Sequence, residues 1–368
     1  MIAATDHAAR DRDARAHLGN HFVQDQLIAR DLATRAITRQ VLTAGRTPRQ
    51  DAAGGLDRGT SPIGIDEGPD GTWCVAFAGS DEIALIPPVG EARFVDVAPA
   101  GLSAPHSCVV LAGGAIAVTS PSSGVVALLR SDGRVRAVER LAPTDAALID
   151  DDPDALQVRW GERAFYESTR SGISCQSCHL HGGSDGLGHN IGSLILAPTL
   201  DTRGVVGTSP YLRDGSYPRL YDLHEVADDV YRGYREPGGD RGATIEAWLS
   251  TLPPPLSIAP RDPARERRGL DVFVRAGCVT CHAFPAFTNL GRHPTVSVFP
   301  DAERAEPGAS LDTPSLRAVS RRSQWLFDGR ATSLEDVLTE HSRAGRHGAV
   351  WDLDDAEIAD LVIFLRSL

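Results

Sequence analysis

Short apolar runs alternate with polar turns over the first third of the chain. Residues 62–88 contain the runs "IGI", "WCVAF" and "EIALI", separated by Pro-Asp-Gly and Gly-Ser-Asp. Residues 107–141 repeat this arrangement, with turns at Gly-Gly, Ser-Ser-Gly and Ser-Asp-Gly. Runs of this length between such turn residues predict antiparallel strands. Residues 21–45 predict further strands of the same kind.

The spacing of about forty residues for each group of four strands is typical of β-propeller blades. The segment "SPIGIDEGPDGTWCVAFAGSDEIALI" resembles a blade of the bacterial YVTN-type β-propellers. A closed ring needs at least about four blades. We therefore expect residues 1–145 to be part of a propeller that is incomplete at its N-terminus. An open sheet packed on the rest of the chain is the alternative.

From residue 151 onward, the pattern predicts helices and long irregular loops, and two segments repeat one another. Each contains a helix with Gly and Phe four apart, a CxxCH motif, a Pro-x-Leu segment, an Asp-Gly turn and a closing helix. An internal duplication predicts two all-α domains, 151–253 and 254–368. The proline-rich stretch 251–263 would join them, because its prolines cannot continue a helix. The expected fold class is multidomain α plus β.

Composition narrows the range of partners. The net charge is −12, which argues against nucleic acid or an anionic membrane as a partner. The sequence has no run of eighteen apolar residues, so we expect no transmembrane segment. It also contains no lysine, which removes lysine amines from the possible metal ligands.

The motifs "SCQSCHLHG" and "GCVTCHAF" carry the chemistry. In the first, Cys175 and Cys178 precede His179. The second has the same arrangement in Cys278, Cys281 and His282. This spacing places two sulfurs on one edge of a haem and the histidine below its iron. The sequence therefore predicts two covalently bound haem c groups, with His179 and His282 as iron ligands.

Zinc and dithiol sites are the alternatives for these cysteines. A zinc ribbon has its cysteine pairs some 15–20 residues apart, whereas the two motifs here lie in separate repeats. A thioredoxin-like dithiol follows a strand of a βαβ unit, and neither motif is in such a context. Haem is the interpretation that fits both motifs and their matched flanks.

The paired motifs, together with "TPSLRAV", "LFDGRATSLEDVLTEH", "APTL" and "SPYLRDGS", resemble the bacterial di-haem cytochrome c peroxidases and the related methylamine-utilisation di-haem oxidoreductase. The resemblance covers residues 151–368. It implies two cytochrome c-like lobes in which electrons enter at one haem while peroxide or another oxidant reacts at the other. A YVTN-type propeller ahead of such lobes is a known architecture in the wider family.

The sixth iron ligand is restricted because Met1 is the only methionine. The resemblance implies a ligand twelve residues beyond the Gly of the second Asp-Gly turn, and that position holds His341. His347 is the competing candidate. In the first repeat the same offset reaches Ala227, which cannot bind iron. The nearby histidines are His181, His189 and His224, of which His189 is the expected ligand; without one, this haem would be open to an oxidant.

Other features qualify the peroxidase interpretation. Arg213 and Phe327 replace the Trp and His that relatives often carry before the Asp-Gly turns. No acid-base glutamate can be assigned; the acidic residues near the expected position are Glu225, Asp228, Asp229 and Glu236.

Three arginines, Arg170, Arg213 and Arg330, are candidates to pair with haem propionates. Cys74 and Cys108 are expected to be buried thiols, with a disulfide as the alternative in an oxidising compartment. The aromatic residues Trp160, Phe165, Trp248, Phe273 and Phe364 are expected to be core packing between the first and last helices of each domain.

The sequence thus predicts a di-haem c-type cytochrome, an electron-transfer oxidoreductase that reduces hydrogen peroxide at its first haem with electrons from a small redox protein. The alternatives are an electron carrier with both haems six-coordinate, and a propeller-based binding or sensor protein. Haem c attachment takes place outside the bacterial cytoplasm, so we expect a periplasmic protein. The N-terminal residues show no apolar signal segment; a chain truncated at its start would explain this.

Overall fold

The structure is a computed structural model that describes residues 2–6, 24–30, 34, 36–42, 59–140, 153–169, 173–189, 197–223, 225, 240–298, 309–342 and 347–368. It divides into two compact units, each described here by itself. The first unit comprises Met1–Ser177 and His224–Trp248, and the second comprises Cys178–Leu223 and Leu249–Leu368. The described strands pair antiparallel throughout, so the fold mixes α-helices with antiparallel sheets.

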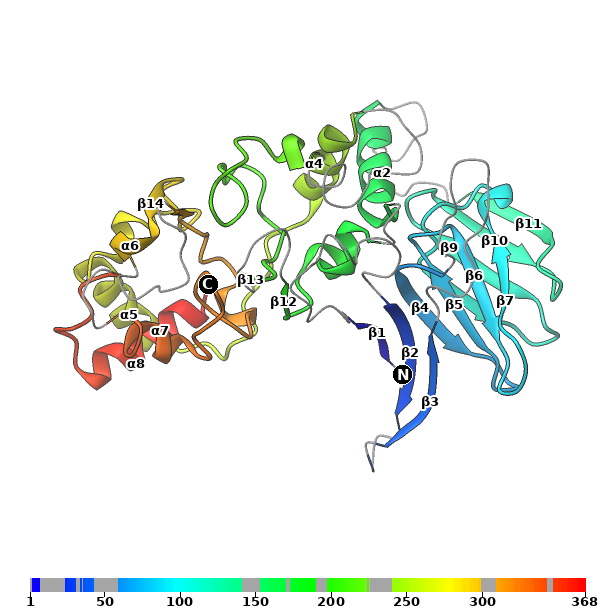
Figure 1. Ribbon diagram of the computed structural model, residues 1–368, viewed down its shortest axis with the longest axis horizontal. Coiled ribbons are helices and arrows are strands. Elements are labelled where there is room, and N and C mark those ends of the chain that lie inside the picture. The colour runs from blue at the N-terminus through cyan, green and yellow to red at the C-terminus, as the bar shows by residue number, and fades with distance from the viewer. Residues whose placement is uncertain are drawn as a thin grey trace. The chain divides into compact units, whose positions relative to one another are not determined.

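Three sheets make up most of the first unit (Figure 1). Strands β1 (Ile2–Asp6), β2 (Gln24–Arg30) and β3 (Ile37–Leu42) form a three-stranded sheet. A four-stranded meander follows with β4 (Pro62–Glu67), β5 (Trp73–Phe77), β6 (Glu82–Ile86) and β7 (Arg93–Asp96). The second meander contains β8 (Ser107–Val110), β9 (Ile116–Ser120), β10 (Val125–Leu129) and β11 (Val135–Arg140). The predicted groups of four strands are therefore present, while the propeller itself stays a prediction.

Strand β5 shows why these sheets stack. Its residues are buried on both faces, and successive side chains of a strand point to opposite faces. Trp73, Val75 and Phe77 share one core with Leu27 of β2. Cys74 and Ala76 belong to another core, which contains residues of β8, β9 and β10. The meander β4–β7 is thus a middle layer between two other sheets.

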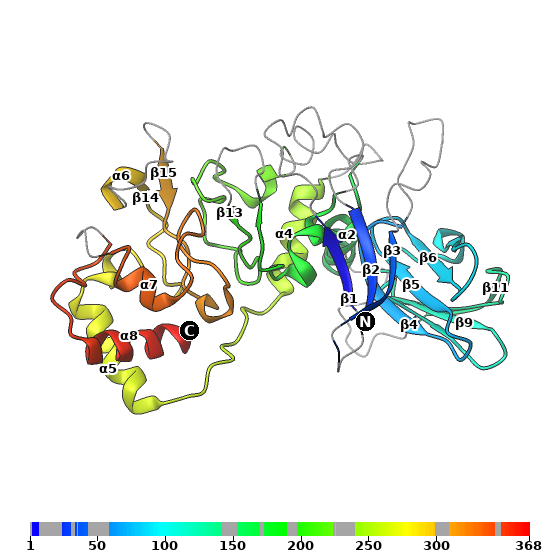
Figure 2. The same cartoon turned by 60° about the horizontal axis from the view of Figure 1, so that its bottom comes forward.

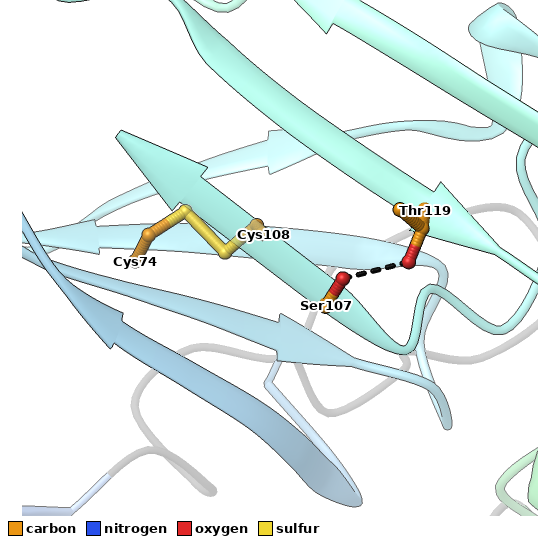
Figure 3. Close-up of a disulfide and its surroundings, with 4 residues drawn as sticks. All are labelled: Cys74, Ser107, Cys108 and Thr119. Carbon is orange, nitrogen blue, oxygen red and sulfur yellow. Dashed lines mark hydrogen bonds between the residues drawn. A yellow bond between two sulfur atoms is a disulfide. The ribbon is translucent and has the colours of Figure 1, made fainter. Parts of the chain in front are cut away.

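A disulfide joins the two meanders, where the sequence predicted two buried thiols. Cys74 of β5 and Cys108 of β8 are bonded, with their Cα atoms 5.8 Å apart (Figure 3). Both residues are essentially unexposed, so the expected burial is confirmed and the expected thiol state is wrong. The reason is the close approach of β4 and β8: a Cβ on Gly64 would lie 2.2 Å from the carbonyl oxygen of His106. That approach brings the cysteine of the neighbouring strand within bonding distance.

Helix α2 (Pro153–Tyr166) crosses helix α4 (Arg241–Thr251) at a glycine. A Cβ on Gly161 would lie 1.8 Å from the carbonyl oxygen of Thr244. Beside this crossing, the rings of Phe165 and Trp248 have centroids 4.6 Å apart. The expected core role of these two aromatic residues is confirmed. Trp160, by contrast, is 64% exposed, because it lies on the other side of α2.

Helices α5 (Pro263–Arg275) and α8 (Asp355–Arg366) repeat this crossing in the second unit (Figure 2). A Cβ on Gly269 would lie 2.1 Å from the carbonyl oxygen of Asp360. The rings of Phe273 and Phe364 pack beside it, with centroids 5.3 Å apart. The predicted match between the repeats therefore extends to the way their helices touch.

The two Asp-Gly turns, both in the second unit, are also built alike. Each has a leucine and a glycine at positive φ: Leu212 with Gly215, and Leu326 with Gly329. Each is closed by an isolated β-bridge, Tyr211 to Tyr217 and Trp325 to Ala331. The sequence repeat at "YLRDGSY" and "WLFDGRA" thus encodes one loop conformation twice.

The remaining elements are short. They are η1 (Ala98–Ala100), η3 (Cys175–Ser177), η4 (Leu180–Gly182), β12 (Gly188–His189), β13 (Ala197–Pro198), η5 (Leu220–Leu223), η6 (Cys278–Thr280), β14 (Arg292–Pro294), α6 (Thr295–Val298), β15 (Ser310–Asp312), η7 (Val319–Arg321) and α7 (Leu334–Leu338). No helix in the described part of the chain has the length and apolarity to cross a bilayer. The division into domains 1–145, 151–253 and 254–368 stays a prediction.

Candidate haem-attachment sites

The first CxxCH motif forms a single tight turn. Cys175 begins the 3-10 helix η3, and Cys178 and His179 follow it directly. The imidazole Nδ1 of His179 lies 2.9 Å from the carbonyl oxygen of Leu200, in the "APTL" segment. Burial lowers the pKa of His179, which favours the neutral imidazole. With Nδ1–H donated to a carbonyl, Nε2 is the nitrogen that can bind a metal.

Buried hydroxyl groups hold the segment before this motif against the sheets of the first unit. Ser174, directly before Cys175, has its Oγ 2.9 Å from that of Ser61. Ser168, after helix α2, donates to the Oγ1 of Thr60 at 2.8 Å. All four side chains are at most 5% exposed. The loop that leads into β4 therefore positions the segment that enters the first motif at Cys175.

The second motif forms the same turn after helix α5. Gly277 at φ 76° ends the helix, and η6 carries Cys278. The Nδ1 of His282 lies 3.1 Å from the carbonyl oxygen of Phe287. Burial, with a smaller contribution from His347, lowers the pKa of His282 to about 4. Here too a neutral imidazole has Nδ1 in a backbone hydrogen bond.

The donor set of each motif fits covalently attached haem. The disulfide joins Cys74 to Cys108 and leaves the four motif cysteines as thiols. A zinc site built from both cysteine pairs is not formed: in the described residues, the group of three potential ligands that lie together is Cys178, Asp185 and His189. Two thiols with an adjacent oriented imidazole, present twice, are what two haem c groups require.

On the second site, the histidine that lies beside His282 is His347. The two imidazole rings have centroids 6.3 Å apart and planes inclined by 68°. His341 is located elsewhere: its backbone N–H donates to the carbonyl oxygen of Asp336. The carboxylate of Asp336 also interacts electrostatically with His341. The assignment of His341 as an iron ligand stays a prediction, and the structure brings a different histidine to the motif.

The first site has no such ring pair with His179 among the described residues. His189 in β12 has its Nε2 2.6 Å from Oδ2 of Asp185, and both lie near the Cys178 sulfur. His189 would have to leave Asp185 to offer that nitrogen to an iron. His181 is exposed and adopts φ 51°. His224 and Ala227 lie outside the described residues.

The acid-base group also stays unassigned. Glu225 is described and exposed. Asp228, Asp229 and Glu236 lie outside the described residues. No proton acceptor for peroxide cleavage can be named from this part of the chain.

Two arginines lie in the second unit with lowered basicity. Burial, with a smaller contribution from repulsion by Arg322, lowers the pKa of Arg213 to about 10. Burial also lowers the pKa of Arg322 to about 10. Arg213 donates to the carbonyl oxygen of Pro198 at 2.5 Å, and Arg322 donates to that of Ser315 at 3.0 Å. Neighbouring guanidinium groups with carbonyl partners form a place where anionic carboxylates are favourable.

The other arginines named from the sequence differ from this pair. Arg330 is bonded to Asp328, at 2.7 Å, and lies over the ring of Phe327. Arg170 lies outside the described residues. Sequence reasoning missed Arg322 because it stands in "SRRSQ" with no distinguishing neighbour. Arg322 stands shortly before the second Asp-Gly turn, and it repels Arg213 of the first turn. Its place beside the repeated turn is the signal in the sequence that could have identified it.

Comparisons with known proteins found one sequence relative and several similar solved structures. No protein-family model matches the chain. Its sequence is 23% identical over 316 residues to cytochrome c551 peroxidase from Nitrosomonas europaea, covering 69% of this chain and 91% of that protein. Similar solved structures include hydrazine synthase from Kuenenia stuttgartiensis, with a TM-score of 0.47, 20% identity, and coverage of 62% of this chain and 89% of that one. The diheme peroxidase BthA from Burkholderia thailandensis has a TM-score of 0.45, 18% identity and the same coverage. The chain is therefore similar, over about two thirds of its length, to a cytochrome c peroxidase.

Proposed function

We propose that this chain is a di-haem c-type cytochrome, an electron-transfer oxidoreductase of the cytochrome c peroxidase type. The observation that carries the proposal is the pair of CxxCH turns, each with its histidine oriented by a backbone carbonyl. Similarity to cytochrome c551 peroxidase supports the same class of chemistry. Bound haem would supply the redox centre, while the protein holds the sulfurs, the imidazoles and the surrounding apolar shell.

The residues that hold the two groups follow from the motifs. Cys175 and Cys178 would attach the first haem, with His179 as iron ligand. Cys278 and Cys281 would attach the second, with His282 as iron ligand. Arg213 and Arg322 would pair with haem propionates, because buried cations need an anion nearby.

The first haem is the better candidate for reaction with an oxidant. In the described residues, its histidine has no second imidazole packed against it, in contrast to His282. We propose hydrogen peroxide as the oxidant and a small redox protein as the electron donor. If His189 leaves Asp185 and binds the first iron, the chain is an electron carrier instead.

The disulfide supports a location outside the cytoplasm. Structural disulfides persist in oxidising compartments, and the bacterial periplasm is one. Haem c attachment has the same requirement, so we propose that the protein works in the periplasm. The meanders of the first unit would be propeller blades, because their innermost strands approach through Gly64.

The test is a haem count. Produced in a host that attaches haem c, the protein should retain two haems per chain after denaturation, measured by pyridine haemochrome absorbance and intact mass. Variants with Cys175→Ser and Cys178→Ser, or with Cys278→Ser and Cys281→Ser, should each retain one. A wild-type protein without covalent haem would refute the proposal. Peroxide-dependent oxidation of a reduced small cytochrome then separates an enzyme from a carrier.

A further inference from the structure

We propose that His347 binds the second iron from the side opposite His282, so that this haem is held by two histidines. The proposal rests on the proposed function, because it presupposes a haem at the second motif. Its starting point is the separation of the two rings, whose centroids are 6.3 Å apart. The sequence names His347 only as a competing candidate, and the offset that the resemblance implies points to His341.

The separation matches what one metal between two imidazoles requires. Metal–imidazole bonds are about 2 Å long, and a ring nitrogen lies about 1.1 Å from its centroid, so two rings on opposite sides of a metal have centroids about 6 Å apart. Direct ring packing also allows such distances. The hydrogen-bond partners of the ring nitrogens distinguish metal binding from direct ring packing.

In both rings Nδ1 takes part in a hydrogen bond, which leaves Nε2 as the nitrogen for a metal. In His282, Nδ1 faces the carbonyl oxygen of Phe287, which can only accept, so Nδ1 carries the proton. In His347, Nδ1 lies 3.2 Å from Oγ of Ser342. The Ser342 hydroxyl donates its own proton to the carbonyl oxygen of Val337. Its oxygen therefore accepts from Nδ1–H of His347, and Nε2 carries the lone pair in both rings.

The segment that carries His347 is attached to the second motif itself. The backbone N–H of Ala349 donates to the carbonyl oxygen of Ala276 at 2.9 Å. Gly348, at φ +79°, lies so close that a Cβ there would be 3.6 Å from the Cys278 sulfur. Ser342, which orients the ring, is only 1% exposed. These contacts place His347 by the same turn that provides the thiols, as expected for an axial ligand supported by hydrogen bonds.

Ligation by His347 assigns a role to the second haem. Two imidazoles would make it six-coordinate and leave no position for peroxide. Imidazole in place of a thioether also lowers the reduction potential, because methionine ligation raises it. The second haem would then pass electrons, and the first would be where an oxidant binds.

The experiment compares His347→Ala with His341→Ala in haem-loaded protein, using ferric EPR and the visible spectrum. We expect His347→Ala to convert one of the two haems from low-spin to high-spin, and added imidazole to restore it. His341→Ala should leave the spin state unchanged. His347→Met retains a ligand and should raise the midpoint potential of one haem in a redox titration.

Haem content is measured first in every variant. Two haems per chain with an unchanged spectrum in His347→Ala would overturn the assignment while leaving the proposed function intact. The same holds if His341→Ala produces the spin change instead. Absence of covalent haem in the wild type would refute the proposed function itself, so the two failures are distinguishable. Ser342→Ala tests the positioning contact, and we expect a partial shift toward high-spin.

Discussion

The two CxxCH sites have the same turn but differ in what surrounds it. At the second site, α5 and the turn after it provide the thiols and His282, and the segment 347–350, bonded to Ala276, brings a second histidine beside His282. The first site depends on a buried hydroxyl cluster that links it to the loop before β4. The two repeats thus share the turn that would attach a haem and differ in the contacts around it.

The largest expected effect is on the free energy of unfolding, and it tests whether the two helix crossings contribute equally to stability. Gly161→Ala and Gly269→Ala should each lower the free energy of unfolding by about 4 kcal/mol or more, because the new Cβ would overlap a backbone carbonyl and separate two helices. Denaturant unfolding of each variant measures the loss. Gly277→Ala is the control: it has positive φ but open space, so we expect about 1 kcal/mol. A large loss at one crossing alone would break the equivalence.

Removal of the disulfide should affect the first site more than the second. Cys74→Ala with Cys108→Ala opens a link between residues 34 apart and should cost about 2–4 kcal/mol. This disulfide lies in the sheets that hold Ser174. The protein around the first haem should therefore unfold at a lower temperature in the variant than in the wild type. The measurement is thermal melting followed by haem absorbance in variants that retain one motif each. An equal effect on the second haem would contradict the difference between the sites.

A smaller effect concerns Glu162, which lies on helix α2 in the same unit as Cys175. Burial raises the pKa of Glu162 to about 7, and its carboxylate lies 3.9 Å from Nε2 of His106 and close to Tyr166. A carboxyl with a raised folded-state pKa binds more protons when folded, so its contribution is present below about pH 4.5 and is lost as the pH rises through 7. Glu162→Gln should therefore stabilise the protein at pH 8 by about 2 kcal/mol. Wild type and variant should agree near pH 4.5, and a persistent gap there would exclude this cause.

The sequence predicted the repeated features because each is local. A CxxCH turn, a Gly four residues before a Phe, and an Asp-Gly turn are all specified within a few residues. The paired helices and turns follow from them. The grouping of strands into fours was also predictable, since turn residues separate the runs.

The features that the sequence missed or left open depend on residues distant along the chain. Cys74 and Cys108 lie in different sheets, and the approach of β4 and β8 at Gly64 brings them together. His347 was the competing candidate for the sixth ligand, and its position beside His282 depends on a backbone bond from Ala349 to Ala276, more than seventy residues away. An offset counted from the Asp-Gly turn has no access to that contact; it names His341, whose ligation stays a prediction. Trp160 and Phe165 lie on the same helix, and the helical period alone did not show which one faces α4.

The glycine crossings have an evolutionary consequence. At Gly161 and Gly269 the closest approach is to a backbone carbonyl, of Thr244 or of Asp360, and the adjacent Trp248 or Phe364 approaches the glycine with its Cβ, which every residue other than glycine has. Neighbouring residues are then free to diverge, as Trp248 and Phe364 have done at matching positions beside them. A duplicated segment held together in this way can lose nearly all resemblance between its copies and still close the same scaffold around each cofactor.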